Sequence, residues 1–191
     1  YGSLQIRNVG TLAGNIATAS PIGDTLPLLL SLDAKIILNG IRNKEEIPIS
    51  EFFVSYRKTK IKKGQFIHSI KIPIYKKSIF KAYKISKRFD DDISSVCGSF
   101  NIEINKNRIK KIKIAYGGMS EIPKRAKNTE KILINSIFSE KIINKAIDNL
   151  ERDYKPIDDM RASKSYRIVV AKNLLLKCFL EVKSKKLLRL N

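Results

Sequence analysis

Three consecutive segments of the chain alternate apolar and polar side chains: residues 79–86, 94–104 and 109–116. A period of two residues places successive side chains on opposite faces, which is the pattern of a β-strand with one buried face. Residues 105–107, with the sequence Asn-Lys-Asn, form a natural hairpin turn between the last two segments. The pattern therefore predicts three antiparallel strands in a row.

The apolar period becomes helical beyond Gly117 and Gly118. Residues 128–134 predict one helix, and residues 139–150 predict a second helix with its apolar side chains on one face. Ser163 is a good N-cap for a third helix, which carries Ile168, Val169, Ala171, Leu174, Leu175, Cys178 and Phe179. The second half of the chain thus predicts an α+β domain, in which a three-stranded antiparallel sheet packs with three helices.

Shorter elements are predicted in the first part of the chain. Residues 25–32 indicate a short helix, residues 35–38 a strand, and residues 65–74 a second strand that Pro73 closes. The segment 75–79 is the predicted domain boundary. Domains commonly have about 100 to 200 residues, so 191 residues suffice for one medium domain or two small ones. Two are expected, residues 1–76 and 77–191.

The segment 5–24, QIRNVGTLAGNIATASPIGD, concentrates small residues and hydroxyls with little bulk. Gly10 and Gly14 allow a positive φ or the close approach of another group. Hydroxyls and amides around outward-pointing N–H groups make an anion-binding concavity of the kind that holds a phosphate. A plain turn between two elements is the alternative interpretation. Leu12 stands where a dinucleotide fingerprint has its second glycine, and the Gly-Lys-Ser/Thr ending of a P-loop is absent.

The formal net charge of +20 would by default indicate an anionic partner such as nucleic acid. The lysines are scattered through every segment, whereas a nucleic-acid binder more often clusters them with interleaved aromatic residues. We therefore expect no nucleic-acid partner. No apolar run approaches the roughly 18 to 20 residues of a membrane span, and no secretory pattern opens the chain. A cytoplasmic protein is expected.

Metal chemistry has few candidate ligands in this sequence. Cys97 and Cys178 lie far apart, and no C-x-x-C motif is present, so neither a zinc ribbon nor an iron–sulfur cluster is expected. Both cysteines are predicted to be buried thiols. His68 is the only histidine, so a multi-histidine metal site or a Ser-His-Asp triad is not expected.

Seven motifs together cover nearly the whole chain. They are QIRNVGTLAGNIATASPIGD from residue 5, YRKT from 56, FIHSIKIP from 66, YKISKRFDDDIS from 83, AYGGM from 115, PKRAKNTE from 123 and DDMRASKSYR from 158. The chain closely resembles the FAD-binding subunit or domain of molybdenum hydroxylases such as xanthine dehydrogenase and carbon monoxide dehydrogenase. The resemblance implies that residues 1–76 are the second half of an FAD-binding domain of antiparallel sheet structure, and residues 77–191 its C-terminal domain.

The resemblance also implies a role. In this family FAD relays electrons from iron–sulfur clusters to NAD or another acceptor, and the hydroxylation takes place on a molybdenum partner. The implied partners are a molybdopterin-binding subunit and a 2Fe-2S subunit or domain. The family's first flavin-binding segment, a strand followed by a Gly-Gly-Thr-type loop, is not among these 191 residues, and half of the cofactor site is expected to come from it.

By resemblance, nine residues contact the flavin cofactor: Tyr1, Thr11, Leu12, Ala13, Gly14, Asn15, Asp24, Ile67 and Lys84. Tyr1 would lie beside the isoalloxazine ring, Ile67 in the apolar wall of the pocket, and Lys84 beside the flavin, where a cation stabilises the reduced form. Ala13 stands where the family has glycine, which is tolerable if its φ is negative. Asp24 is expected both to face the flavin and to cap the helix that follows it.

The loop after the Lys84 strand carries Arg88, Asp91 and Asp92. Charge close to the flavin ring could bias hydride exchange with NAD, and a plain salt-bridged loop is the competing interpretation. Two further groups, Arg125 with Glu130 and Asp159 with Arg161 and Arg167, are expected to dock the helices on the sheet. Two other functions stay open at this point: a flavin-free docking module of the same complex, and a basic nucleic-acid binder.

Overall fold

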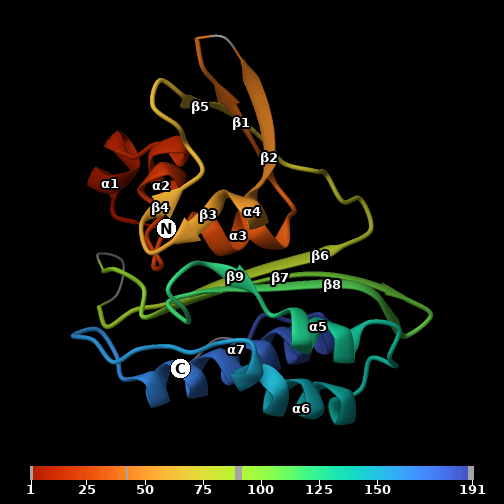
Figure 1. The fold of residues 1–191 in the computed structure, drawn as a ribbon. Coiled ribbons are helices and arrows are strands. Elements are labelled where there is room, and N and C mark those ends of the chain that lie inside the picture. The colour runs from red at the N-terminus through yellow and green to blue at the C-terminus, as the bar shows by residue number, and fades with distance from the viewer. Residues whose placement is uncertain (1, 42, 89–91, 189–191) are drawn as a thin grey trace.

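The structure is a computed structural model that describes residues 2–41, 43–88 and 92–188. A four-stranded antiparallel sheet occupies the middle of the molecule, in the order β6-β7-β8-β9. Helices α5, α6 and α7 cover one face of this sheet, and α3 lies on the other face beneath the N-terminal part of the chain (Figure 1). The elements of the sheet are β6 (Ile79–Ile85), β7 (Val96–Asn105), β8 (Arg108–Gly117) and β9 (Lys124–Arg125).

The α+β prediction for the second half of the chain is confirmed, with one addition. The three predicted strands correspond to β6, β7 and β8, which pair antiparallel with Lys84 opposite Cys97 and Gly98 opposite Tyr116. The addition is β9, which pairs through only two residues, Lys124 and Arg125. Three helices follow: α5 (Lys127–Leu133), α6 (Glu140–Asn149), continued by the short 3-10 helix η1 (Leu150–Arg152), and α7 (Lys164–Ser184).

The larger core fills the space between this sheet and the three helices. Phe100 and Tyr116 point from the sheet into the core, where they meet Leu174 and Phe179 of α7. The Tyr116 hydroxyl donates a hydrogen bond of 2.8 Å to the carbonyl oxygen of Ala171. Ser163 caps α7 as predicted, because its hydroxyl accepts from the N–H of Tyr166 at 3.2 Å. These contacts fix α7 along the sheet.

A smaller sheet in the first part of the chain has the order β2-β1-β5, with both pairs antiparallel. Its strands are β1 (Lys35–Asn39), β2 (Lys44–Pro48) and β5 (Phe66–Lys71), and nearby lie α3 (Thr25–Ser31), α4 (Ile49–Phe52) and the short pair β3 (Phe53–Ser55) and β4 (Lys58–Thr59). Fully buried Leu26, Ile36 and Phe52 belong to a second apolar core. Ser31 joins the two halves, because its hydroxyl lies 2.6 Å from that of Ser99 on β7.

An ion-pair network also joins the two halves. Arg125 donates to both oxygens of Glu130, at 3.0 and 2.6 Å, and to Asp33 at 3.2 Å. Lys113 forms a second ion pair with Asp33. A separate ion pair, within the second half of the chain, links buried Arg167 to Asp159 at 2.7 Å. The predicted pairs Arg125–Glu130 and Asp159–Arg167 are therefore confirmed, and the first reaches across to the loop after α3.

The glycine-rich segment contains two short helices, which the sequence did not predict. Residues 4–9 form α1 (Leu4–Val9) and residues 12–18 form α2 (Leu12–Thr18), capped by the hydroxyls of Ser3 and Thr11. Gly10 has a φ of −72°, so it needs no left-handed backbone. A Cβ at Gly14 would lie 2.8 Å from the Thr11 hydroxyl. The glycine is thus required by the close approach of a cap within the chain itself.

Within the described residues, no helix combines the length and the apolar character needed to cross a membrane.

Candidate functional site

A hollow of ≈ 510 Å³ lies where α1, the start of α3 and the loop before β7 meet. Three of the predicted cofactor residues line it together: Asn15 from α2, Asp24 before α3 and Lys84 from β6. Their side chains come from segments as far apart as residues 15 and 84, which only the packing of α3 on the sheet brings together. The other lining residues are Gly2, Ser3, Gln5, Ile6, Ile22, Gly23, Asp92, Ile93 and Ser94.

Lys84 is not a free cation in this hollow. Its ammonium donates to Asp24 Oδ2 at 2.6 Å and to Ser94 Oγ at 2.9 Å. The Ser94 hydroxyl in turn donates to Asp24 Oδ1. The side chains of Asp24 and Lys84 are 12% and 24% exposed, so the pair is shielded from bulk water on most sides. The positive charge of Lys84 is therefore largely offset by its partner.

The predicted capping role of Asp24 is wrong. Asp24 precedes α3, yet its side chain makes no capping hydrogen bond to the helix. A capping residue has an extended backbone, whereas Asp24 already has helical angles, φ −64° and ψ −30°. Its carboxylate is directed to Lys84 and Ser94 instead.

Asn15 is held against the start of α3. Its Oδ1 accepts a hydrogen bond of 2.5 Å from the Thr25 hydroxyl. Gly23 lies so close that a Cβ there would be 3.2 Å from Asn15 Oδ1 and 3.1 Å from Leu26. Because its carbonyl oxygen is bonded within the protein, Asn15 presents its amide NH₂ as the remaining donor.

The first turn of α2 contains the other predicted residues of the glycine-rich segment. Thr11 is the N-cap, and its hydroxyl accepts from the N–H of Gly14 at 3.0 Å. The N–H groups of Leu12 and Ala13 have no partner inside the helix, as at any helix start. Thr11, Leu12 and Gly14 are exposed. Ala13 lies within α2 and its φ is not positive, so alanine is tolerated where the family has glycine.

The other predicted cofactor residues of the described chain do not line this hollow: Thr11, Leu12, Ala13 and Gly14 belong to the start of α2, and Ile67 lies on β5, where it is partly buried against the N-terminal core. Tyr1 and Asp91 lie outside the described residues.

The loop after β6 favours the salt-bridged interpretation for Arg88 and Asp92. The side chain and the backbone N–H of Arg88 both donate to Asp92 Oδ2. The hydrogen bond from the Arg88 side chain, together with the N–H of Ile93, lowers the pKa of Asp92 below its usual value. Asp92 also lines the hollow, so a paired carboxylate faces this space.

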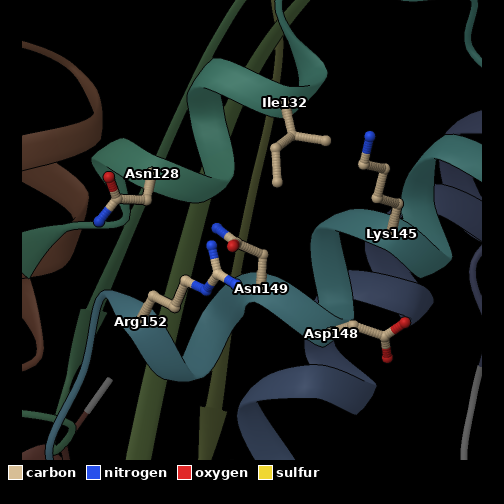
Figure 2. Close-up of a pocket in the computed structure, with 6 residues that line it drawn as sticks. All are labelled: Asn128, Ile132, Lys145, Asp148, Asn149 and Arg152. Carbon is tan, nitrogen blue, oxygen red and sulfur yellow. The ribbon is translucent and has the colours of Figure 1, made fainter.

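The surface has further hollows besides this one. One of ≈ 660 Å³ shares Asn15, Ile22, Gly23 and Ile93 with the first and extends to Tyr56 and Arg57. A separate one of ≈ 580 Å³ lies between α5, α6 and η1 (Figure 2). In Figure 2 its side chains do not converge on a common point, and Asp148 points away from Asn128 and Arg152.

Both cysteines are buried free thiols, as predicted. Burial raises the pKa of each thiol to about 12, so neither is a reactive thiolate. In residues 2–41, 43–88 and 92–188, no group of three or more His, Cys, Asp or Glu side chains could hold a metal ion.

Comparison with known families accounts for both halves of the chain. Residues 1–75 match the FAD binding domain in molybdopterin dehydrogenase, and residues 81–182 match the CO dehydrogenase flavoprotein C-terminal domain. The chain belongs to the flavoprotein family of molybdenum hydroxylases. The cofactor of this family's binding domain is FAD.

Two relatives in this family can be aligned with most of the chain. A xanthine dehydrogenase from Blastobotrys adeninivorans is 37% identical over 162 residues, which are 81% of this chain and 12% of that protein. The glyceraldehyde dehydrogenase medium chain of Sulfolobus acidocaldarius is 32% identical over 184 residues, 95% of this chain and 64% of its own. The chain thus spans less than two thirds of these relatives.

Solved structures show the same fold. Reconstituted CO dehydrogenase from Oligotropha carboxidovorans has a TM-score of 0.86 at 22% identity, over 94% of this chain and 63% of that chain. Quinoline 2-oxidoreductase from Pseudomonas putida 86 also has a TM-score of 0.86, at 20% identity, over 96% of this chain and 64% of that one.

The donors around the first hollow suit a flavin dinucleotide. The Asn15 amide and the Lys84 ammonium are donors in its lining, and the N–H groups of the first turn of α2, outside the lining, are of the kind that binds phosphate oxygens. Gly14 and Gly23 keep this backbone free of side chains. Ser94 was missed by sequence reasoning, because a single serine at the start of a strand carries no signal.

Proposed function

We propose that this chain forms part of the FAD site of a molybdenum hydroxylase and passes electrons from 2Fe-2S clusters to NAD or another acceptor. The observation that carries the proposal is the hollow lined jointly by Asn15, Asp24 and Lys84. Its wall comes from both family segments, residues 1–75 and 81–182. We place the domain boundary between residues 76 and 77, in the interval between those segments.

The proposed contacts follow from the chemistry of each group. The first turn of α2, from Thr11 to Asn15, would hold the pyrophosphate through backbone N–H groups and the Asn15 amide. Asp24 and Lys84 would lie on the flavin side of the site, Tyr1 beside the ring and Ile67 in its apolar surroundings. FAD accepts electrons singly or in pairs, which lets one site link iron–sulfur clusters to a two-electron acceptor.

Lys84 would act on the flavin through its charge. A cation near the ring favours the reduced, anionic form. Because Asp24 lies 2.6 Å from the ammonium, the effect of Lys84 would be that of a dipole and not of an isolated charge. This pairing moderates the reduction potential that Lys84 alone would set.

The neighbouring hollow of ≈ 660 Å³ is the proposed entry for the acceptor. Three cations of its lining, Arg57, Lys155 and Arg161, form no ion pair with a carboxylate of the described residues. The lining also contains Glu121 and the ion pair of Arg167 with Asp159. Tyr56 is 56% exposed at the same place. Cations beside an exposed aromatic ring suit an anionic ligand with a flat ring system, such as NAD. The partners in this proposal are a molybdopterin-binding subunit and a 2Fe-2S subunit.

Cofactor binding tests the site first. In the enzyme that contains this chain, the double variant Asn15→Ala and Asp24→Ala is expected to weaken FAD binding roughly 5- to 150-fold, since each removed polar contact contributes roughly 0.5 to 1.5 kcal/mol. The matched control is Asn149→Ala with Asp148→Ala, at the hollow of Figure 2. An unchanged FAD dissociation constant in the first double variant would refute the site. An enzyme purified without flavin would favour a docking role.

The acceptor is tested separately. Anaerobic addition of NADH is expected to bleach the visible absorption of bound flavin, and Arg57→Ala is expected to raise the NADH concentration needed. If an artificial electron donor bleaches the flavin and NADH does not, the FAD assignment stands and NAD is excluded as the acceptor.

A further inference from the structure

Ser94 occupies a buried position at the centre of the proposed flavin site. The residue is 1% exposed, and it lies at the end of the loop between β6 and β7. Its hydroxyl accepts from Lys84 Nζ at 2.9 Å and donates to Asp24 Oδ1. Both the donor and the acceptor capacity of the hydroxyl are therefore used between two charged groups.

The three side chains close a ring of hydrogen bonds. Lys84 donates to Asp24 Oδ2 at 2.6 Å, and Ser94 joins the same lysine to the other carboxylate oxygen. A lysine side chain has several rotatable bonds, so a single ion pair leaves its ammonium free to move. A second acceptor in a fixed place restricts the ammonium to one position. Hydrogen bonds to charged groups are also stronger than neutral ones.

The backbone that carries Ser94 is itself held firmly. The N–H of the next residue, Ser95, donates to the carbonyl oxygen of Ile85 at 2.8 Å, beside Lys84 on β6. The carbonyl oxygen of Ser95 accepts from buried Arg167. Ser94 therefore belongs to a segment held by backbone hydrogen bonds, and its hydroxyl gives Lys84 an acceptor in a defined position.

We propose that Ser94 is a positioning residue for Lys84: it fixes the ammonium and the Asp24 carboxylate relative to each other at the edge of the hollow. The inference rests on the proposed function, because it assigns a role toward bound FAD. Ser94 does not itself contact the cofactor in this proposal. It acts by setting where the positive end of the Lys84–Asp24 pair lies.

The test compares four variants of the enzyme that contains this chain, each with two measurements. Ser94→Ala removes only the hydroxyl, and Ser94→Thr keeps it. Ser95→Ala is the matched control, because Ser95 is also buried and its hydroxyl donates to the backbone carbonyl oxygen of Arg161 instead of contacting Lys84. Lys84→Met removes the positioned charge. The measurements are the FAD dissociation constant of the apoenzyme, from flavin fluorescence, and the flavin reduction potential, from spectroelectrochemistry.

We expect Ser94→Ala to raise the FAD dissociation constant about three- to tenfold, because the Lys84 ammonium is then no longer held in the position in which it meets the cofactor. The flavin reduction potential of the Ser94→Ala variant is expected to shift in the same direction as that of Lys84→Met, by a smaller amount. Ser94→Thr is expected to behave as the wild type, and Ser95→Ala to change neither quantity.

The outcomes separate the inference from the proposed function. If Lys84→Met changes the potential while Ser94→Ala does not, Ser94 has no positioning role although the flavin site stands. Equal effects of Ser94→Ala and Ser95→Ala would reduce the role to packing and would also overturn the inference. If Lys84→Met changes neither quantity, the flavin site itself is wrong, and the inference falls with it.

Discussion

Glu181 ties α7 to β6, the strand that carries Lys84. Its side chain is 2% exposed, and it accepts hydrogen bonds from Lys177 at 2.7 Å, Tyr83 at 2.9 Å and the N–H of Leu188 at 3.2 Å, with Lys81 at 3.1 Å as a second ion-pair partner. Lys81 and Tyr83 both belong to β6. A buried carboxylate with this set of donors is stabilised as the anion.

The stabilisation can be estimated from the pKa. Burial raises the pKa of Glu181, but the hydrogen bonds from Lys177, Lys81 and Tyr83 outweigh it and lower the pKa from 4.5 to about 2. A difference of about 2.5 pH units corresponds to about 3 kcal/mol. Because the pKa is lower in the folded chain, this stabilisation is fully present above pH 4.5. It is lost progressively as the pH falls to about 2.

The perturbation is Glu181→Gln, with urea denaturation measured at a series of pH values from about 7 down to about 3. We expect the wild type to be more stable than the variant at neutral pH, and the difference in free energy of unfolding to shrink steadily below about pH 4.5. Glu51→Gln is the control, because the Glu51 side chain is 62% exposed and lies 3.7 Å from Lys60. A difference between wild type and Glu181→Gln that stays constant with pH would refute the reasoning.

Three further predictions follow from buried groups. Arg125→Met is expected to lower the free energy of unfolding by about 3 to 5 kcal/mol, because it leaves Glu130, which is 3% exposed, without its cation. Urea denaturation measures the loss, and adding Glu130→Gln to the same chain should restore part of the stability. Gly118→Ala is expected to cost at least about 2 kcal/mol in the same assay, since Gly118 has a φ of +79° and a Cβ there would lie 2.3 Å from the Ser95 carbonyl oxygen. Cys97 is expected to react with iodoacetamide only at the rate of unfolding, because burial raises its pKa to about 12; rapid alkylation of the native chain, followed by mass spectrometry, would contradict this.

The strands of the large sheet could be predicted because their information is local. Each of β6, β7 and β8 has a two-residue period, and a short turn joins the last two. The features that were missed carry no such pattern. β9 contains only Lys124 and Arg125, and the register shift between Glu103 and Ile104 depends on the partner strand. Neither leaves a period in the sequence.

The two helices of the glycine-rich segment could not be predicted, because short helices depend on their caps. α1 and α2 have six and seven residues, too few for an apolar period to be visible and too few to be stable in isolation. Their starts depend on Ser3 and Thr11, two hydroxyls among several in the same stretch. Small residues at this density are typical of turns, and the tertiary contacts of α2 with α3 and β5 override that preference.

The site could be predicted as a set of residues but not as an arrangement. Resemblance indicates Asp24 and Lys84 separately, 60 positions apart in the chain, whereas their pairing at 2.6 Å appears only once α3 packs on the sheet. The pairing changes what each charge does. Removing Lys84 leaves the Asp24 carboxylate uncompensated beside the proposed flavin, while removing the charge of Asp24 releases the ammonium from its partner.

Opposite effects on the flavin are therefore expected from the two partners. Lys84→Met should lower the reduction potential of bound FAD, because negative charge that develops on the reduced ring then meets a carboxylate without its cation. Asp24→Asn should raise the potential, since it keeps the size of the side chain, removes its negative charge and leaves Lys84 as a net positive charge. Spectroelectrochemical titration of both variants tests the sign. Shifts in the same direction would mean that the two side chains act through packing and not as an ion pair.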